Sequence, residues 1–449
     1  MALLYDARLG YDFNAHWPTI LYYAERHAVP PLDLNAETCQ PPLFYVIAAA
    51  VVARGLDAGA LGWLGALWGV ARLALIWVGL EKWLPGSRLA RVTALALAAV
   101  LPASAHLDGM ITNETLLMLL SAAVIVVAPS AIAAARTGRV APMVGLSLLL
   151  ALALMSKVSA SVLVMSIAVA VGLEIVRAAP PSTWWRALRA RARPLLAGAL
   201  VLAAVAGPFF VRNEILYGHL SPTAYEGPVK EENAQYEKIP YLQRRSIGFY
   251  LAWNLPIYVR PLFPTGLRPD ARFFPVLLAS TFNDYYAFSF SGGGKYNHDR
   301  WIPGAGITTG AMSVMAGTPI ALVTVFAWFA ATRALWRRRD DGEPDPRFAL
   351  LLAPPGALIG ALHFATKYPD DHFGPIKGAY LQFIAPILCA LFGVGVAWMW
   401  GRGGRRWRAA ALVAMGAVLV VAAYTVQARL PRFGPEGYRA APFFAPDRK

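Results

Sequence analysis

The sequence predicts an all-α integral membrane protein with about ten transmembrane helices. Hydrophobic residues make up 57% of the 449 residues, and the mean hydropathy is +0.47. Only 15% of the residues are charged, whereas soluble domains carry roughly 25%. Uncharged segments of about the length that a helix needs to cross the hydrocarbon core recur along most of the chain. We therefore expect one polytopic membrane domain over residues 1–449, with no separate soluble domain.

Ten apolar segments are predicted to cross the membrane, several of them near the lower limit of roughly 17 residues. They are 59–82, 92–107, 112–135, 140–156, 158–176, 195–211, 308–332, 347–364, 379–400 and 409–427. A further apolar stretch, Pro41 to Ala53, is too short to cross comfortably. We expect a juxtamembrane or re-entrant helix there, with a short genuine span as the alternative.

Basic residues give the predicted helices an orientation. The net charge of +15 comes from 41 Lys and Arg against 26 Asp and Glu. These basic residues gather in short connections, which the positive-inside rule assigns to the cytoplasmic side. That placement explains the charge without nucleic-acid binding. The connections assigned to the inside are 82–91, 136–139, 185–193, 337–339 and 402–408.

The opposite, outer face receives the remaining connections. It is predicted to hold the juxtamembrane segment 1–58, the turn at 106–114, Lys157, the loop 212–307, the turn at 367–377 and the C-terminal tail 428–449. A loop as long as 212–307 inside a compact protein is usually functional. The N-terminus then lies outside with no preceding helix. We expect a misassigned start codon or a missing leading helix, with an N-terminus translocated unaided as the less favoured alternative, and a complete protein that crosses eleven times.

The outer face begins with a candidate carboxylate and a candidate imidazole. In GYDFNAHW at 10–17, Asp12 precedes His16 by four residues, so a helix places both on one side. The segment CQPPLFY at 39–45 follows and leads into the membrane. A carboxylate at that position meets lipid-borne molecules, whereas the simpler interpretation is a pair of solvated surface residues.

A second acidic turn, HLDGMITNETL at 106–116, offers Asp108 and Glu114. Glu114 has a purely structural interpretation as well. Thr112 or Asn113 can begin the following helix, and a carboxylate in the first turn stabilises the helix dipole. Both roles are compatible in one residue.

Two basic residues fall within or between the apolar segments. A charged side chain at mid-bilayer costs roughly 2.5 to 3.5 kcal/mol, and less near the interface. Lys157 in MSKVSA separates two apolar segments, which places it at the outer interface. Arg72 lies deep within 59–82 and requires an outer-face carboxylate, an anionic ligand or a structural ion pair with another helix.

The order of these residues resembles the C-type membrane glycosyltransferases (GT-C), especially the protein O-mannosyltransferase and aminoarabinose transferase group. The first outer loop of that family carries Asp-Glu, a nearby His and a Pro-Pro aromatic motif. Phe13 stands here where the family has Glu. The matching residues are Asp12, His16, Gln40, Pro41, Pro42 and Tyr45.

Three later segments resemble family motifs. The acidic turn 106–116 resembles the place of another essential acidic residue, and Lys157 resembles a lysine that contacts the lipid phosphate. KYPDDHFGPIKGAYLQF at 367–383 resembles a late motif in which a basic residue and a tyrosine precede a helix. Lys377 and Tyr380 occupy those positions.

The resemblance implies a GT-C fold and a transferase that moves a monosaccharide from a polyprenyl-phosphate donor to an acceptor hydroxyl, with inversion. Lipid, polysaccharide and protein acceptors stay open. It implies Asp12 as base or acceptor-orienting carboxylate and Glu114, or Asp108, as the second acidic residue. The implied substrate-binding residues are His16, Arg72, Lys157, Lys377 and Tyr380. The Ala, Gly and Arg bias suggests a bacterial inner membrane, with the site facing the periplasm or exterior.

A polytopic transporter or lipid flippase is the alternative function, because it also carries charges among apolar segments. Transporters tend to place such residues at the midplane and in repeated halves. This sequence instead gathers its acidic residues at one face and shows no repeat. A divalent cation stays open as a cofactor. Its candidate ligands, in a spacing that is not diagnostic, are His298, Asp299, Asp370, Asp371 and His372.

Overall fold

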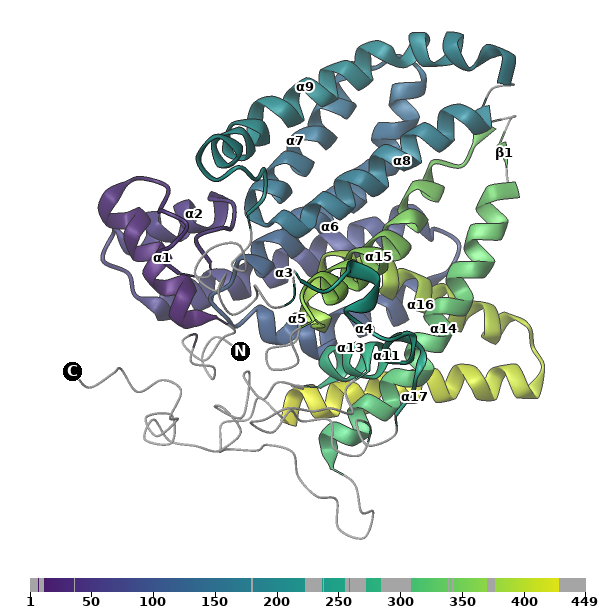
Figure 1. The fold of residues 1–449 in the computed structure, drawn as a ribbon. Coiled ribbons are helices and arrows are strands. Elements are labelled where there is room, and N and C mark those ends of the chain that lie inside the picture. Colours follow the sequence, from purple (N-terminus) through teal and green to yellow (C-terminus); the bar gives the residue numbers. More distant parts are fainter. Residues whose placement is uncertain are drawn as a thin grey trace.

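A computed structural model describes residues 7, 12–35, 37–178, 181–222, 236, 238–254, 258, 272–283, 308–337, 339–340, 343–369 and 376–427. Within these ranges seven helical segments are long and apolar enough to cross a membrane, and shorter apolar helices accompany them. The expected all-α polytopic membrane architecture is confirmed (Figure 1).

The long helices coincide with predicted apolar segments. Two shorter helices, α7 and α8, also match predicted segments, although their apolar lengths fall just below that of a full crossing. The matching helices are α3 (Ala58–Trp83), α6 (Asn113–Arg136), α7 (Val140–Ser156), α8 (Ser161–Ala178), α9 (Trp184–Tyr217), α14 (Thr309–Arg337), α15 (Ala353–Lys367), α16 (Ala385–Gly401) and α17 (Arg405–Gln427).

Four predicted segments are not continuous α-helices; in one of them, 158–176, the 3₁₀ helix η2 (Val158–Ala160) precedes α8. The segment 92–107 divides into α4 (Arg88–Val100) and α5 (Pro102–Leu107), because Leu101 is extended with ψ 114° before a proline. The residue before proline disfavours the helical region, and proline has no N–H to continue the helix. Short 3₁₀ helices, η6 (Pro346–Leu352) and η7 (Gly378–Ile384), precede α15 and α16.

Helix α9 extends beyond its predicted limits at both ends. The basic segment 185–193, expected to be a connection, forms the first turns of this 34-residue helix after η3 (Pro181–Thr183). Its backbone hydrogen bonds do not stop where the apolar surface ends. Arg212 likewise belongs to α9 rather than to the outer loop. The helix ends before Gly218, whose φ of 71° is the left-handed conformation that favours glycine at a helix end.

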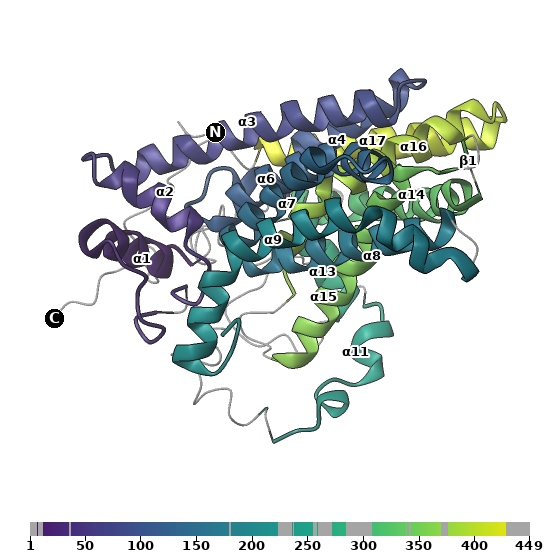
Figure 2. The same cartoon turned by 90° about the horizontal axis from the view of Figure 1, so that it is seen from above.

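Two short helices, α1 (Phe13–Arg26) and α2 (Leu43–Val52), precede the bundle. Ten residues of α2 span about 15 Å, half of the hydrocarbon core, so α2 is too short for a full crossing, and its juxtamembrane position stays a prediction. The two helices pack together with α3 through buried side chains that include Ile20, Phe44, Tyr45 and Leu61. Figures 1 and 2 show them at one end of the bundle.

The basic connections gather at the opposite end of the bundle. Figures 1 and 2 show there the connection from α8 to α9, the turn from α16 to α17, and the pairing of β1 (Arg339–Asp340) with β2 (Glu343–Pro344). Arg136 and Glu174 form a buried ion pair, and Arg347 Nη1 donates to the carbonyl oxygen of Trp83 at 3.0 Å. The segregation of basic turns from α1 and α2 follows the predicted topology, whereas the assignment of sides stays a prediction.

The described part of the predicted loop 212–307 contributes η5 (Tyr241–Gln243), α11 (Ile247–Leu251) and α13 (Phe273–Phe282). Helix α13 joins the bundle: Ser280 Oγ accepts from the backbone N–H of Gly378 at 2.8 Å, and Ser313 Oγ donates to the Phe282 carbonyl at 2.6 Å. The Gly-rich segment 291–301 and the tail 428–449 lie outside the described residues, as does almost all of the aromatic segment 282–290.

A glycine face on α3 brings the acidic turn close to the helix. Gly62, Gly65 and Gly69 recur at spacings of three and four residues, which place them on one side of the helix. A β-carbon at Gly65 would lie 2.9 Å from the Asp108 carbonyl oxygen, and one at Gly69 would lie 2.6 Å from the Asp108 carboxyl. A side chain at Gly65 would collide with the backbone of the turn, so glycine allows the acidic turn to lie against α3.

Candidate functional site

The acidic turn ends in a capped helix. Thr112 is the N-cap of α6, and its Oγ1 accepts from the Glu114 N–H at 3.3 Å. Thr115 Oγ1 donates to the Leu107 carbonyl at 2.8 Å, which ties the first turn of α6 to the segment before it. The structural interpretation of this segment, a capped helix with Glu114 in its first turn, is therefore correct. The cap uses only the backbone N–H of Glu114, so the Glu114 carboxylate can make another interaction.

The Glu114 carboxylate pairs with Lys157. The distance from Lys157 Nζ to Glu114 Oε1 is 2.7 Å, and the two side chains are 14% and 4% exposed. Lys157 also donates to Asn113 Oδ1 at 3.3 Å. Burial alone lowers the pKa of Lys157, but the negative charges of Glu114 and Glu37 outweigh it and raise this pKa. Lys157 is therefore a charged ammonium held at one position.

Tyr380 lies between two ammonium groups. Its ring centroid is 5.6 Å from Lys157 Nζ and 5.8 Å from Lys377 Nζ. Tyr380 belongs to η7, for which Lys377 is the N-cap residue. Cations within about 6 Å of an aromatic ring are attracted by its negative face. The predicted residues Lys157, Lys377 and Tyr380 thus meet in one cluster.

Asp12 adds a more exposed carboxylate to this cluster. It is the N-cap residue of α1 in the left-handed conformation, with φ 56°, and its side chain makes no capping hydrogen bond. Its Oδ2 lies 4.0 Å from Lys377 Nζ, and the side chain is 53% exposed. Desolvation by the surrounding protein raises the pKa of Asp12. The positive charge of Lys377, followed by those of His16 and Lys157, outweighs this effect and holds the pKa below its ordinary value.

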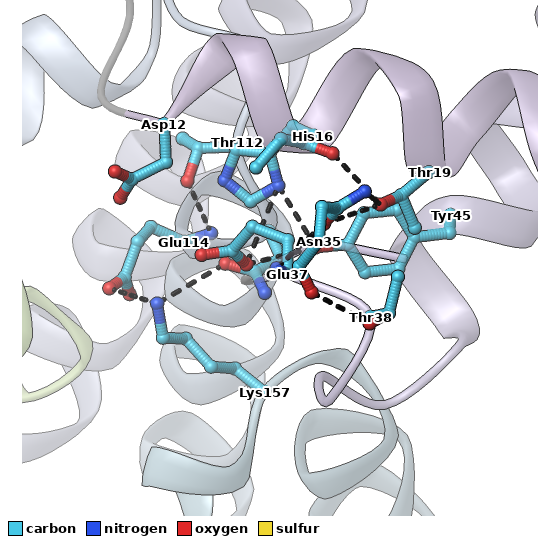
Figure 3. Close-up of polar contacts among 12 residues, drawn as sticks. Asp12, His16, Thr19, Asn35, Glu37, Thr38, Tyr45, Thr112, Glu114 and Lys157 are labelled. Atoms are coloured by element: carbon cyan, nitrogen blue, oxygen red, sulfur yellow. Dashed lines mark hydrogen bonds and ion pairs between the residues drawn. The ribbon is translucent and has the colours of Figure 1, made fainter. Parts of the chain in front are cut away.

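His16 belongs to a hydrogen-bonded chain that the sequence did not reveal in full. His16 Nδ1 is 2.9 Å from Tyr45 Oη, and Tyr45 Oη donates to Glu37 Oε2 at 3.1 Å (Figure 3). Tyr45 was predicted only as a part of the family resemblance, and Glu37 was not predicted. The sequence signal for Glu37 was an acidic residue three positions before Gln40, shortly before the Pro41–Pro42 pair.

Arg72 and Asp108 form a separate pair. Arg72 Nη2 donates to Asp108 Oδ2 at 2.9 Å, and Arg72 Nη1 lies 2.8 Å from Met118 Sδ. Of the partners predicted for Arg72, the structure shows the carboxylate of Asp108, in the acidic turn. The two acidic candidates are thereby distinguished: Asp108 faces the mid-helix arginine of α3, whereas Glu114 faces Lys157.

The described ranges contain no group of three or more His, Cys, Asp or Glu side chains that could hold a metal ion. The candidate ligands Asp370, Asp371, His372, His298 and Asp299 all lie outside those ranges. A hollow of about 600 Å³ near the start of α9, lined by Ser182, Trp185, Arg186 and Arg189, contains no carboxylate and lies away from the cluster around Lys157.

Comparison with solved structures finds weak likenesses in fold, two of which follow. The chain is similar to the crystal structure of ArnT from Cupriavidus metallidurans bound to undecaprenyl phosphate, at 13% identity and a TM-score of 0.44, over 96% of this chain and 73% of that one. The apo structure of the same protein aligns at 15% identity and a TM-score of 0.35, over 88% and 73% of the two chains. No protein-family model matches the chain, and no curated protein does.

Proposed function

We propose that this protein is a GT-C-type glycosyltransferase that moves a monosaccharide from a polyprenyl-phosphate donor to an acceptor hydroxyl at the outer membrane face. The observation that carries the proposal is the position of two ammonium groups, Lys157 and Lys377, beside the ring of Tyr380 and next to the half-exposed carboxylate of Asp12. Such a reaction requires stabilisation of the departing phosphate and acceptance of the hydroxyl proton.

The two lysines suit a phosphate monoester at a membrane surface. An ammonium is a compact charge that donates in several directions, and hydrogen bonds from it to a phosphate oxygen are charge-assisted. Glu114 fixes Lys157 at 2.7 Å, so little reorganisation is required when charge develops on the leaving group. In this account Lys157 is the main phosphate ligand, and Lys377 is the second.

Asp12 is the group that accepts the acceptor's proton. With the donor absent, Lys377 keeps the pKa of Asp12 low, and a low pKa means a weak base. A phosphate bound to Lys377 neutralises that ammonium, so donor binding raises the basicity of Asp12. The acceptor oxygen then bonds to the anomeric carbon, the proton passes to Asp12, and the lipid phosphate leaves with the electrons of the broken bond. Attack opposite the phosphate inverts the anomeric carbon.

The remaining candidates support these groups. Glu114 holds Lys157 and faces the substrates, so it is favoured over Asp108 as the second acidic residue. Asp108 is held by Arg72 at 2.9 Å and fixes the turn that carries Glu114. The role of Arg72 is then structural rather than phosphate binding. The part played by His16 depends on its hydrogen-bonded neighbours and is considered below.

The proposed setting follows the basic connections. With those connections on the cytoplasmic side, the cluster faces the periplasm or exterior of a bacterial inner membrane. The partners are a polyprenyl-phosphate sugar, membrane lipids and a lipid, polysaccharide or protein acceptor. A divalent cation stays open as a cofactor.

The transporter or flippase alternative predicts ionisable residues at mid-membrane that are free to bind cargo. The mid-helix residue Arg72 is already neutralised by Asp108. The ionisable side chains around Lys157 lie instead where α1 and α2 meet the bundle. This distribution favours surface chemistry over passage through the membrane.

Sugar transfer in reconstituted liposomes tests the proposal. Labelled polyprenyl-phosphate sugars are supplied with membrane acceptors, and transfer is followed by the appearance of labelled product. We expect Lys157→Gln and Lys377→Gln to lower the rate by about 10² or more, on the scale of a lost charge-stabilising donor. Lys82→Gln, on the last turn of α3 at the opposite end, is the control and retains wild-type activity. Lipid flipping or solute uptake that requires no sugar donor would contradict the proposal.

A further inference from the structure

Glu37, Tyr45 and His16 form one continuous hydrogen-bonded chain. We propose that Glu37 is a positioning residue, which acts through Tyr45 to hold the His16 proton on Nδ1 and leaves Nε2 as a hydrogen-bond acceptor for a substrate hydroxyl. The inference rests on the proposed function, because the hydroxyl belongs to the sugar or acceptor of that reaction.

Counting the protons along the chain gives this assignment. Glu37 Oε2 lies 3.1 Å from Tyr45 Oη, and an ionised carboxylate only accepts hydrogen bonds. The tyrosine therefore donates its single hydroxyl hydrogen to Glu37. Tyr45 Oη lies 2.9 Å from His16 Nδ1, and with its hydrogen committed this oxygen accepts. Nδ1 must then carry the proton, and in the neutral ring Nε2 carries the lone pair.

The surroundings hold this chain in place. The exposed fractions are 2% for His16 and 0% for Tyr45. The Tyr23 ring stacks on Tyr45 with centroids 5.9 Å apart and planes within 8°, and Phe44 packs edge-on against Tyr45 at 5.3 Å. Burial, followed by the charge of Glu37, raises the pKa of Tyr45 well above its ordinary value, so the hydroxyl keeps the proton that it donates. Water cannot easily supply an alternative partner to Nδ1.

The second ring nitrogen faces the candidate site. Figure 3 shows one nitrogen of His16 directed at Tyr45 and Glu37 and the other on the side of Asp12 and Thr112. Glu37 Oε2 also lies 3.6 Å from Nδ1, close enough to stabilise the imidazolium if Nε2 receives a proton. The charged and titratable groups around the ring are Asp12 on α1, Glu37, Tyr45 on α2, Glu114 on α6, Lys157 after α7 and Lys377 before η7.

An accepting Nε2 next to Asp12 has a specific use. A hydroxyl group has one hydrogen to donate, so Nε2 of His16 and the carboxylate of Asp12 each accept from a different hydroxyl. His16 therefore orients a hydroxyl of the sugar or of the acceptor, while Asp12 takes the proton of the attacking one. This arrangement requires the Nδ1–H tautomer, since the other tautomer would present a donor to the substrate.

The tautomer is measured directly by ¹⁵N NMR of the full protein, labelled at histidine and held in lipid. The His16 signals are assigned by their loss in His16→Asn. We expect the Nδ1–H tautomer in the wild type and its loss in Tyr45→Phe. Tyr23→Phe, which removes a hydroxyl from the neighbouring stacked ring, is the matched control and keeps it. An Nε2–H tautomer in the wild type, or an unchanged tautomer in Tyr45→Phe, overturns the inference.

The transfer kinetics of variants test the positioning role of Glu37 and Tyr45 independently. Partners that orient an active ligand typically contribute 10- to 100-fold, so we expect Tyr45→Phe and Glu37→Gln each to lower kcat by about that factor, with an unchanged KM for the donor. His16→Asn combined with Tyr45→Phe should be no slower than His16→Asn alone, because the two residues act as a unit. Effects that multiply overturn the inference. Glu37→Gln preserves side-chain shape, so it retains the test if Tyr45→Phe fails to fold. If the wild type transfers no sugar, the proposed function fails, and the NMR result still decides the tautomer.

Discussion

Asp12 is the residue in which the charge of neighbouring side chains most directly affects the proposed reactivity. Lys377 and the other nearby cations lower its pKa, so the folded protein binds this proton less readily than the unfolded chain. The stabilisation from Asp12 is therefore present above its ordinary pKa of about 3.9 and is lost as the pH falls through the lower folded value. Asp12 is ionised throughout the physiological range.

Removal of the Lys377 charge should shift the acid limb of the pH profile. In Lys377→Gln the main influence that lowers the pKa of Asp12 is absent while burial still raises it, so this pKa rises. We expect the acid limb of kcat/KM, which reports groups of the free enzyme, to move to higher pH. Lys82→Gln should leave the limb in place. Coincident acid limbs in wild type and Lys377→Gln would show that another group titrates.

The pair of Glu114 and Lys157 should be more costly to break than to remove. Glu114→Gln leaves a buried ammonium without its carboxylate, and losses of about 3 to 5 kcal/mol are typical of that change. The combined change Glu114→Gln with Lys157→Met removes the charge from both positions and should recover much of the loss. Unfolding of the purified proteins in detergent measures both. Equal stability of wild type and Glu114→Gln would contradict the role given to this pair.

The residues of the cluster could be predicted from the sequence to different extents. Asp12 and His16 were found by their four-residue spacing, and Lys157 by the cost of a charge between apolar segments. Lys377 and Tyr380 came from the family resemblance alone. Glu37 was missed because its importance arises from a contact across the connection between α1 and α2. The partner of Arg72 was left open, since no sequence rule selects one carboxylate among several.

At the scale of elements, apolar length predicted where helices cross but not where they break or extend. The proline at 102 divides one predicted segment, and α9 continues through basic residues at its start. Hydropathy measures the environment of side chains, whereas helix limits depend on backbone hydrogen bonds. The glycine face of α3 was not predicted, because its role depends on the position of the acidic turn.

Gly69→Ala tests whether the acidic turn requires glycine on the facing side of α3. The added β-carbon would lie 2.6 Å from the Asp108 carboxyl, so either the turn or the Arg72 pair must move. We expect a loss of about 1 to 3 kcal/mol, as for overpacked interiors, together with reduced transfer. Gly145→Ala on α7, which meets nothing within 4 Å, is the control and should be neutral or slightly stabilising. Equal behaviour of the two variants would contradict the close approach.

For the whole molecule, the segregation of basic turns predicts which side each end of the bundle faces. Asp33→Cys, in the connection between α1 and α2, and Gly86→Cys, in the turn after α3, should react with a membrane-impermeant thiol reagent from opposite sides. Asp33→Cys should be labelled in intact cells and Gly86→Cys only after permeabilisation. The native Cys39 and Cys389 are buried and set the background. Labelling of both variants from one side would contradict the topology.

In the proposed reaction, sugar transfer from a lipid phosphate depends on the carboxylate of Asp12. Its most direct test is the transfer rate of Asp12→Asn in liposomes containing a polyprenyl-phosphate sugar and membrane acceptors, beside Asp33→Asn, an exposed aspartate in the neighbouring connection. We expect loss of transfer in a folded Asp12→Asn protein and wild-type transfer in Asp33→Asn. Full transfer by Asp12→Asn would contradict it.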